Sequence, residues 1–484
     1  MIRLTRRQFL GRAALLTLPA LQMKAWAGNV DAVSPRLNVL MVKSDEHNPL
    51  YSSVYGHPFV QTPNLDRLAA RGVVFENAYC ASPLCMPSRS AFMSGRRVHE
   101  IQTYSNCNIF SYDYPTYGRV LRDQGIHTVH LGKTDVYNRS ETLGFSEMIL
   151  PGDRAMGGDP VISRHPLMIR HDGATRANGF GVREDPYRAD NQKVEAALNW
   201  LKNTAPTLTV PWTMEVNVVK PHFPHYTTQE MWDLYAPHED LPAYGMQEES
   251  ARHPYAQDHR AHFQTDGFTD AQIRGLRRGY YACVSYIDRL LGKILDGLEE
   301  TGLAQNTIVV YTTDHGEMLG KFGMWWKCSL YEDSARVPLV VAGPGFAPAR
   351  RVVTPVDQFD LQSSLFAATR SKRPTEWVGA PLQTIPERDN DRVVFSEYHG
   401  HGTRASSYMI RRGNWKYLHY CEAPHQLFDL ASDPAELHNL AEQKPELRRE
   451  MEEILRSICD PEAENRRAEE MIQKQLAALA KLNQ

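Results

Sequence analysis

Continuous apolar runs and helical periodicities alternate along the chain. The run LNVLMV at residues 37–42 has no polar alternation, which is typical of a strand buried on both faces of a parallel sheet. Four more segments predict strands of the same kind: residues 127–133, 212–219, 307–313 and 337–343. The chain therefore contains the strands of one large sheet, spread over about 300 residues.

Three segments between these runs carry helical signals. The segment TPNLDRLAARG has Thr62 as an N-cap, Pro63 at the first helical position and Gly72 at its end. Residues 190–203 and 269–302 repeat apolar side chains at helical spacing. Strands that alternate with helices predict an α/β sandwich with a large, mostly parallel sheet.

Charged side chains follow directly after these predicted strands. They are Asp45, Lys133, Lys220 with His222, and Asp314 with His315. Any one of them could be a surface residue at a strand end. Because the carboxyl ends of parallel strands meet at one edge, where open α/β sheets build their sites, we expect these side chains to form one functional site.

The pattern of apolar and charged residues changes at about residue 386. Short strand patterns and a charged helical tail replace the long apolar runs. We therefore expect a main catalytic α/β domain over residues 36–385 and a smaller α+β subdomain over residues 386–484.

The first 27 residues have the composition of an export signal. Arg6 and Arg7 precede Phe9-Leu10 and a short apolar stretch, and Ala25-Trp26-Ala27 forms an A-x-A cleavage site. The arginine pair is similar to a twin-arginine signal, with an ordinary secretory signal or a basic arm as alternatives. We expect the twin-arginine translocase as a partner, a periplasmic or secreted location, and no stable membrane anchor.

Overall charge excludes one class of function. The 484 residues carry a formal net charge of −3, without a basic run interleaved with aromatic residues. We therefore expect no nucleic-acid partner.

The seven cysteines are widely spaced and include no CxxC pair. This spacing indicates neither a zinc knuckle nor a dense disulfide scaffold, and an odd number leaves at least one cysteine unpaired. Cys85 is the candidate, because it begins a predicted helix in the stretch SPLCMPSRSAFMSG, where the helix dipole favours a nucleophile.

The strand-end residues have the chemistry of a metal-assisted oxyanion site. Asp45 and Asp314 are hard oxygen ligands with His315 beside the second, which suits Ca²⁺, or Mg²⁺, better than zinc. Cationic side chains that could hold a tetrahedral oxyanion are Arg89, Lys133, Lys327 and, if protonated, His222. These residues narrow the reaction to phosphoryl or sulfuryl transfer, and a plain Cys85 thiol would serve a phosphatase-like reaction.

The stretch Cys85-Met86-Pro87-Ser88-Arg89, followed by Ser94-Gly95, resembles the C-x-P-S-R signature of type I sulfatases. Further blocks are similar and stand in the family's order: NVLMVKSDEHN, TPNLDRLAARGVVFENAY, LGK, KPHFPH, TTDHGEMLGKFGMWWK and LFDLASDPAELHNL. The resemblance covers residues 36–442. It implies an alkaline-phosphatase-like fold and a sulfuric ester hydrolase whose cysteine a maturation enzyme oxidises to formylglycine; the hydrated aldehyde attacks sulfur and then expels sulfate.

The resemblance also implies a role for each matching residue. Asp45, Cys85 as formylglycine, Asp314 and His315 match the metal ligands. Arg89 matches the residue that stabilises the hydrated aldehyde. Lys133 and Lys327 match the sulfate-binding lysines, and His222 matches a histidine that contacts sulfate and is a candidate proton donor to the leaving oxygen.

Two positions depart from the family pattern. Glu46 replaces a second aspartate, and its longer side chain puts its role as a ligand in doubt. Asp135 replaces a histidine after the lysine of G-K-x-H, and it can either act as the base or orient Lys133. The second departure resembles arylsulfatase K and related uronate 2-sulfatases.

The substrate expected from these likenesses is a 2-O-sulfated uronic acid in a glycan. His399 and His401, in EYHGHG, are candidate substrate contacts or else polar residues of the small subdomain. Two other substrates stay open: the segments SDEHN and GHP also resemble choline-sulfatase-like enzymes, and a phosphonate monoester or phosphodiester hydrolase of the same fold would keep all these motifs.

Overall fold

A computed structural model describes residues 36–107, 110, 113–136, 143–152 and 161–482. The segment from Arg36 to Gln484 forms one compact unit. The expected export signal lies outside the described residues. Within the described part of the chain, no helix has the length and apolarity to cross a membrane.

The compact unit is organised around a sheet of eight strands in the order β12-β2-β11-β9-β1-β7-β4-β5. The central strand β1 pairs in parallel with β7 and β9, and β4 pairs in parallel with β7 and β5. Their bounds are β1 (Asn38–Asp45), β2 (Gly72–Phe75), β4 (His127–Lys133), β5 (Glu147–Gly152), β7 (Trp212–Pro221), β9 (Thr307–Thr313), β11 (Val340–Ala342) and β12 (Arg350–Val352). The prediction of a large, mostly parallel sheet is confirmed.

One predicted strand differs in the structure. Residues 337–343 divide into β10 (Arg336–Val337), in a small second sheet, and β11, which runs antiparallel to both β2 and β9. Pro338 lies between the two pieces and has no N–H to give to a strand ladder, which favours a break there.

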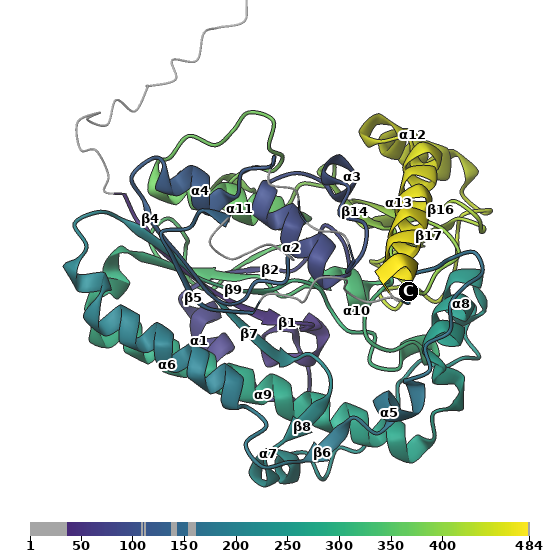
Figure 1. The fold of residues 1–484 in the computed structure, drawn as a ribbon, viewed down its shortest axis with the longest axis horizontal. Helices are drawn as coiled ribbons and strands as arrows, with labels where there is room; N and C mark the ends of the chain where they lie inside the picture. Colours follow the sequence, from purple (N-terminus) through teal and green to yellow (C-terminus); the bar gives the residue numbers. More distant parts are fainter. Residues whose placement is uncertain (1–35, 108–109, 111–112, 137–142, 153–160, 483–484) are drawn as a thin grey trace, which may run out of the picture. The chain divides into compact units, whose positions relative to one another are not determined.

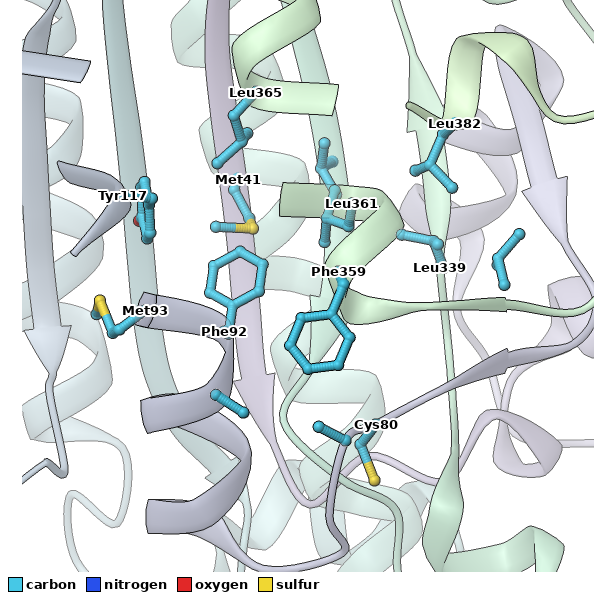
Figure 2. Packing of buried hydrophobic residues seen from close by; sticks show 14 of the residues in the cluster. Met41, Cys80, Phe92, Met93, Tyr117, Leu339, Phe359, Leu361, Leu365 and Leu382 are labelled. Atoms are coloured by element: carbon cyan, nitrogen blue, oxygen red, sulfur yellow. The ribbon is translucent and has the colours of Figure 1, made fainter. Parts of the chain in front are cut away.

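Helices cover both faces of the large sheet (Figure 1). One face carries α1 (Pro63–Ala70), α6 (Arg188–Asn203) and α9 (Asp270–Glu300); the other carries α2 (Cys85–Ser94), α4 (Tyr117–Arg122) and α11 (Gln358–Thr369). The alternation of β1 shows both layers, because Val39 and Met41 belong to one apolar core and Leu40 and Val42 to another. Figure 2 shows Met41 packed among side chains of α2 and α11.

The C-terminal part forms an antiparallel sheet of its own, as expected for the α+β subdomain. Its strands are β14 (Val393–Tyr398), β15 (Ser407–Arg412), β16 (Trp415–Tyr420) and β17 (Gln426–Asp429), with α12 (Pro445–Ile458) packed on them and α13 (Pro461–Leu482) following. Buried ion pairs join it to the main core: the Lys416 ammonium lies 2.8 Å from Glu332 of the main part, and the Lys321 ammonium of the main part lies 3.5 Å from Glu436.

The remaining elements are short. They are β3 (Ala78–Tyr79), β6 (Phe180–Val182), β8 (His225–Thr227), β13 (Val356–Asp357), α3 (Val98–Ile101), α5 (Gly173–Ala177), α7 (Gln229–Leu234), α8 (Pro254–Phe263) and α10 (Glu332–Ala335).

Candidate active site

Cys85 is the first residue of α2 and is fully buried at the carboxyl edge of the large sheet. Ser88 lies inside the first turn of α2, and its hydroxyl donates to the carbonyl oxygen of Asp314 at 2.6 Å. This bond ties the start of α2 to the end of β9.

Four of the predicted residues converge into one cluster. The ligand atoms of Asp45, Cys85, Asp314 and His315 all lie within 4.8 Å of one another. Oδ1 of Asp45 is buried and has no hydrogen-bond partner, which leaves it available to a cation. Carboxylate oxygens with one imidazole form a donor set that fits a hard divalent cation.

The orientation of His315 agrees with this fit. Nδ1 donates to the carbonyl oxygen of Gly316 at 3.0 Å, and Nε2 lies 3.3 Å from the sulfur of Cys85. Burial alone would lower the pKa of His315, but the carboxylate of Asp314 raises it to about 9. A metal ion that binds Nε2 must therefore displace a proton.

Arg89 bridges the two carboxylates of the cluster. Its guanidinium donates to Oδ2 of Asp314 at 2.8 Å and to Oδ2 of Asp45 at 3.1 Å. A third bond, of 2.9 Å, goes to Oδ1 of Asn217 on β7. Sequence reasoning missed Asn217, although a polar residue within a buried strand was the signal that could have found it.

Lys133, at the end of β4, contacts both Asp45 and Asp135. Its ammonium lies 3.3 Å from Oδ2 of Asp135, which is buried and has a left-handed backbone conformation with φ of 56°. Burial would raise the pKa of Asp45, but Lys133 and other cations hold it well below its usual range. The Asp135–Lys133 contact matches the role of an orienting carboxylate.

Lys327, hydrogen-bonded to His222, supplies a second positive charge on another side of the site. The Lys327 ammonium donates to Nε2 of His222 at 2.6 Å and to Oε2 of Glu46 at 3.3 Å. Nδ1 of His222 donates to the carbonyl oxygen of Phe223 at 2.7 Å. Burial and the Lys327 charge lower the pKa of His222 to about 4, so the imidazole is neutral at neutral pH and is not one of the site's cations.

Glu46 lies beside the metal cluster as well. Its Oε1 is buried and has no hydrogen-bond partner, and the ligand atoms of Asp45, Glu46 and His222 also fall within 4.8 Å of one another. The structure thus brings Glu46, whose role was in doubt, into contact with Lys327 and beside Asp45.

The two candidate histidines of the small subdomain behave differently. His399 is fully buried, and its ring nitrogens bond Oε2 of Glu397 and the hydroxyl of Ser406, both at 2.8 Å. Both ring nitrogens of His399 are thus engaged within the protein, which favours the alternative that His399 is a buried polar residue of the small subdomain. His401, two residues later, lines a cavity next to Lys327.

Cys85 differs from Cys80 in its electrostatic surroundings. None of the seven, all within the described residues, forms a disulfide. Burial would raise the pKa of the Cys85 thiol, but Lys133 and Lys327 bring it down to about 7, whereas burial raises the pKa of Cys80. The cations around residue 85 therefore stabilise an anion at this position.

Comparison with known proteins agrees with this geometry. Residues 37–371 match the family model described as sulfatase, and residues 320–460 match the C-terminal model of N-sulphoglucosamine sulphohydrolase. Arylsulfatase K of Xenopus laevis is 31% identical over 88% of this chain and 83% of its own. Choline-sulfatase of Rhizobium meliloti (strain 1021) is 32% identical over 84% of this chain and 82% of its own.

Solved structures share the fold. A 2-O GAG sulfatase superposes with a TM-score of 0.68 at 22% identity, covering 89% of this chain and 96% of that one. The phosphonate monoester hydrolase of Agrobacterium radiobacter also gives a TM-score of 0.68 at 22% identity, over 87% of this chain and 95% of that one. With the family model spanning most of the described sheet and the site assembled at its carboxyl edge, the chain belongs to the sulfatase family and is a sulfuric ester hydrolase.

Proposed function

We propose that this enzyme removes sulfate from a 2-O-sulfated uronic acid in a glycan, using formylglycine at residue 85 and Ca²⁺. The observation that carries the proposal is the convergence of Cys85 with Asp45, Asp314 and His315, flanked by the ammonium groups of Lys133 and Lys327. A buried cluster of opposite charges with one orphaned carboxylate oxygen suits a cation and an oxyanion bound together.

Formylglycine and a divalent cation would each add one kind of chemistry. Formylglycine would supply a hydrated aldehyde as the nucleophile toward sulfur. A divalent cation held by Asp45, Asp314, His315 and residue 85 would polarise a sulfate oxygen.

The chain's own residues bind and orient the ester. Lys133 and Lys327 supply ammonium donors for the sulfate oxygens, while Asp135 and Glu46 fix where these ammonium groups lie. The hydrogen bond between Lys327 and His222 holds a proton beside the sulfate position, and we assign this pair as the proton source for the leaving oxygen.

The substrate class rests on similarity together with Asp135. Arylsulfatase K is among the relatives, and a 2-O GAG sulfatase is among the structures of the same fold. Asp135 contacts Lys133 where many family members have a histidine, a departure that resembles uronate 2-sulfatases.

The first test is the mass of the peptide that carries residue 85, in protein made with its maturation enzyme. Formylglycine lowers this mass by about 18 Da relative to cysteine. Active protein with an unmodified thiol would overturn the mechanism. A Cys85→Ala variant, made in parallel, should release no sulfate from any ester.

Substrate assays then separate the alternatives. Sulfate release from a 2-O-sulfated uronide should exceed release from choline sulfate and hydrolysis of a phenylphosphonate monoester. A higher kcat/KM for the phosphonate would replace the proposal with phosphonate monoester hydrolysis, the activity for which the Agrobacterium enzyme is named.

A further inference from the structure

A small cavity opens beside Lys327 and His222, the pair assigned as the proton source for the leaving oxygen. Its volume is about 170 Å³. The described residues that line it include Arg176, Phe223, Phe263 and Trp326. Because the leaving oxygen must lie within reach of its proton donor, the alcohol part of a bound sulfate ester would extend into this cavity. The walls of the cavity therefore bear on which alcohols the enzyme accepts.

Three aromatic rings surround the guanidinium group of Arg176. Its central carbon lies 4.4 Å from the ring centre of Phe223, 5.0 Å from that of Trp326 and 5.8 Å from that of Phe263. The ring of Trp326 also packs against the other two, at centroid distances of 5.5 Å for Phe223 and 5.0 Å for Phe263. All three contacts of the guanidinium fall within the range of cation–π attraction, about 6 Å. These rings form one aromatic box, and Arg176 occupies it.

The chain also holds Arg176 from its own helix. Its Nε donates to Oδ2 of Asp172 at 2.8 Å, and Asp172 is the N-cap residue of α5, four positions before Arg176. A guanidinium that is bonded to a carboxylate at one edge and packed against rings on its faces has a defined place. The aromatic box is therefore filled by the protein's own cation before a substrate enters.

An aromatic box of this kind is suited to a quaternary ammonium ion, because the faces of aromatic rings attract a weakly hydrated cation. In this chain that attraction is already satisfied. The guanidinium of Arg176 lies against Phe223, and the ammonium of Lys327 lies 5.5 Å from the centre of the same ring. A trimethylammonium group in the cavity would find the ring faces covered and would meet two like charges. The alcohol part of a neutral or anionic substrate would meet no such repulsion.

We propose that Arg176 is a specificity-determining residue, which fills the aromatic box and thereby excludes cationic sulfate esters such as choline sulfate. The inference rests on the proposed function, because it places the leaving alcohol in this cavity, and it narrows the substrate class to esters of neutral or anionic alcohols. Exclusion of a competing substrate by a misplaced charge is a common source of specificity. It requires no hydrogen bond from Arg176 to the substrate.

The test compares two esters of the same shape: choline sulfate and 3,3-dimethylbutyl sulfate, in which a carbon atom replaces the charged nitrogen. The unaltered enzyme should hydrolyse the neutral ester with the higher kcat/KM, by about 10-fold or more, which is the effect of one nearby like charge at a protein surface. The measured quantity is the ratio of the two kcat/KM values, neutral ester over choline sulfate. It is internal to each protein, so a smaller folded fraction does not change it.

Three substitutions separate the charge of Arg176 from its occupancy of the box. Arg176→Lys keeps the charge and should keep the preference for the neutral ester. Arg176→Met fills the box without a charge and should lower the ratio toward one. Arg176→Ala empties the box, so the uncovered rings should attract the cation and bring the ratio below one. A merely structural role of Arg176 would leave the ratio equal in all three variants.

The matched control is Arg183→Ala. Arg183 also lies against an aromatic ring, with its guanidinium carbon 3.5 Å from the ring centre of Tyr226, but it is exposed and is not among the described residues that line the cavity. This variant should keep the ratio of the unaltered enzyme. If Arg176→Ala does not fold, Arg176→Met compared with Arg176→Lys still decides the role of the charge.

The failures of the two proposals are distinguishable. A preference of the unaltered enzyme for choline sulfate, or an unchanged ratio in both Arg176→Met and Arg176→Ala, would overturn the role of Arg176, while the uronide ester is judged by its own assay. The expected ratios without any release of sulfate from a 2-O-sulfated uronide would refute the proposed substrate alone. If neither alkyl ester is hydrolysed, calorimetry with tetramethylammonium decides: Arg176→Ala should bind it about 10-fold more tightly than the unaltered enzyme, and equal affinity refutes the role of Arg176.

Discussion

Replacement of Arg89 by lysine tests how the active site is held together. Arg89 is 2% exposed, and its guanidinium makes bonds to Asp314, Asp45 and Asn217 of 2.8, 3.1 and 2.9 Å. A fourth, of 3.2 Å, goes to the carbonyl oxygen of Lys133. Lysine keeps the charge but presents its donors from a single atom, so it cannot span partners on four different segments.

The size of the effect follows from these contacts. Lysine would keep one carboxylate contact, and would lose the bond to the other carboxylate as well as those to Asn217 and to the carbonyl. A buried group left without its partner costs about 1–3 kcal/mol. Allowing for partial relaxation, we expect Arg89→Lys to lower the free energy of unfolding by about 3–5 kcal/mol, the range found when a buried ion pair is broken.

The assay is urea unfolding followed by tryptophan fluorescence, in EDTA, because a cation bound to Asp45 and Asp314 would replace part of the lost charge. The matched control is Arg289→Lys, whose single 2.7 Å pair with Glu230 is exposed. It should cost less than about 1 kcal/mol. If Arg89→Lys costs no more than this control, the guanidinium does not restrain the site and the reasoning fails.

Three more outcomes are expected. Asp314→Asn should abolish the rise in melting temperature that Ca²⁺ gives the EDTA-treated enzyme, because it removes a carboxylate from the cluster; an undiminished rise would place the cation elsewhere. Lys416→Met should lower the free energy of unfolding by about 3–5 kcal/mol, since it leaves Glu332 buried without its ammonium partner and Glu436 with only the Lys321 ammonium, 3.5 Å away. An unchanged urea midpoint would contradict the role of these pairs. His259 has a pKa lowered to about 3 by burial, so between pH 6.5 and that value the unfolded chain binds its proton and the folded chain does not. Stability should therefore fall on acidification, by about 2 kcal/mol for this residue between pH 7 and 5, and His259→Asn should show a correspondingly shallower fall in its urea midpoints.

Much of the site could be predicted because its residues sit at strand ends. Asp45 ends β1, Lys133 ends β4, and Asp314 directly follows β9. Parallel pairing brings these ends together whatever the loops do, and the C-x-P-S-R motif added Cys85 and Arg89. The apolar runs likewise predicted the strands and the long helix α9, because burial on both faces of a sheet, or on one face of a helix, imposes its period on the sequence.

Other features depended on contacts between distant segments. Asn217 looked like any polar residue of a strand until β7 placed it against Arg89, 128 residues away. His399 and His401 look equivalent in the sequence. In the structure, both ring nitrogens of His399 bond Glu397 and Ser406, whereas His401 lines the cavity next to Lys327.

The sequence by itself therefore determined the strands, the helices, the reaction chemistry and the edge at which that chemistry gathers. The tertiary structure alone decided the protonation of His222, beside Lys327, and the meeting of Arg170 and Arg176 with His401 around one cavity. The physical reason is range: periodicity records burial within a segment, whereas the partner of a loop side chain depends on how segments far apart in the chain pack together.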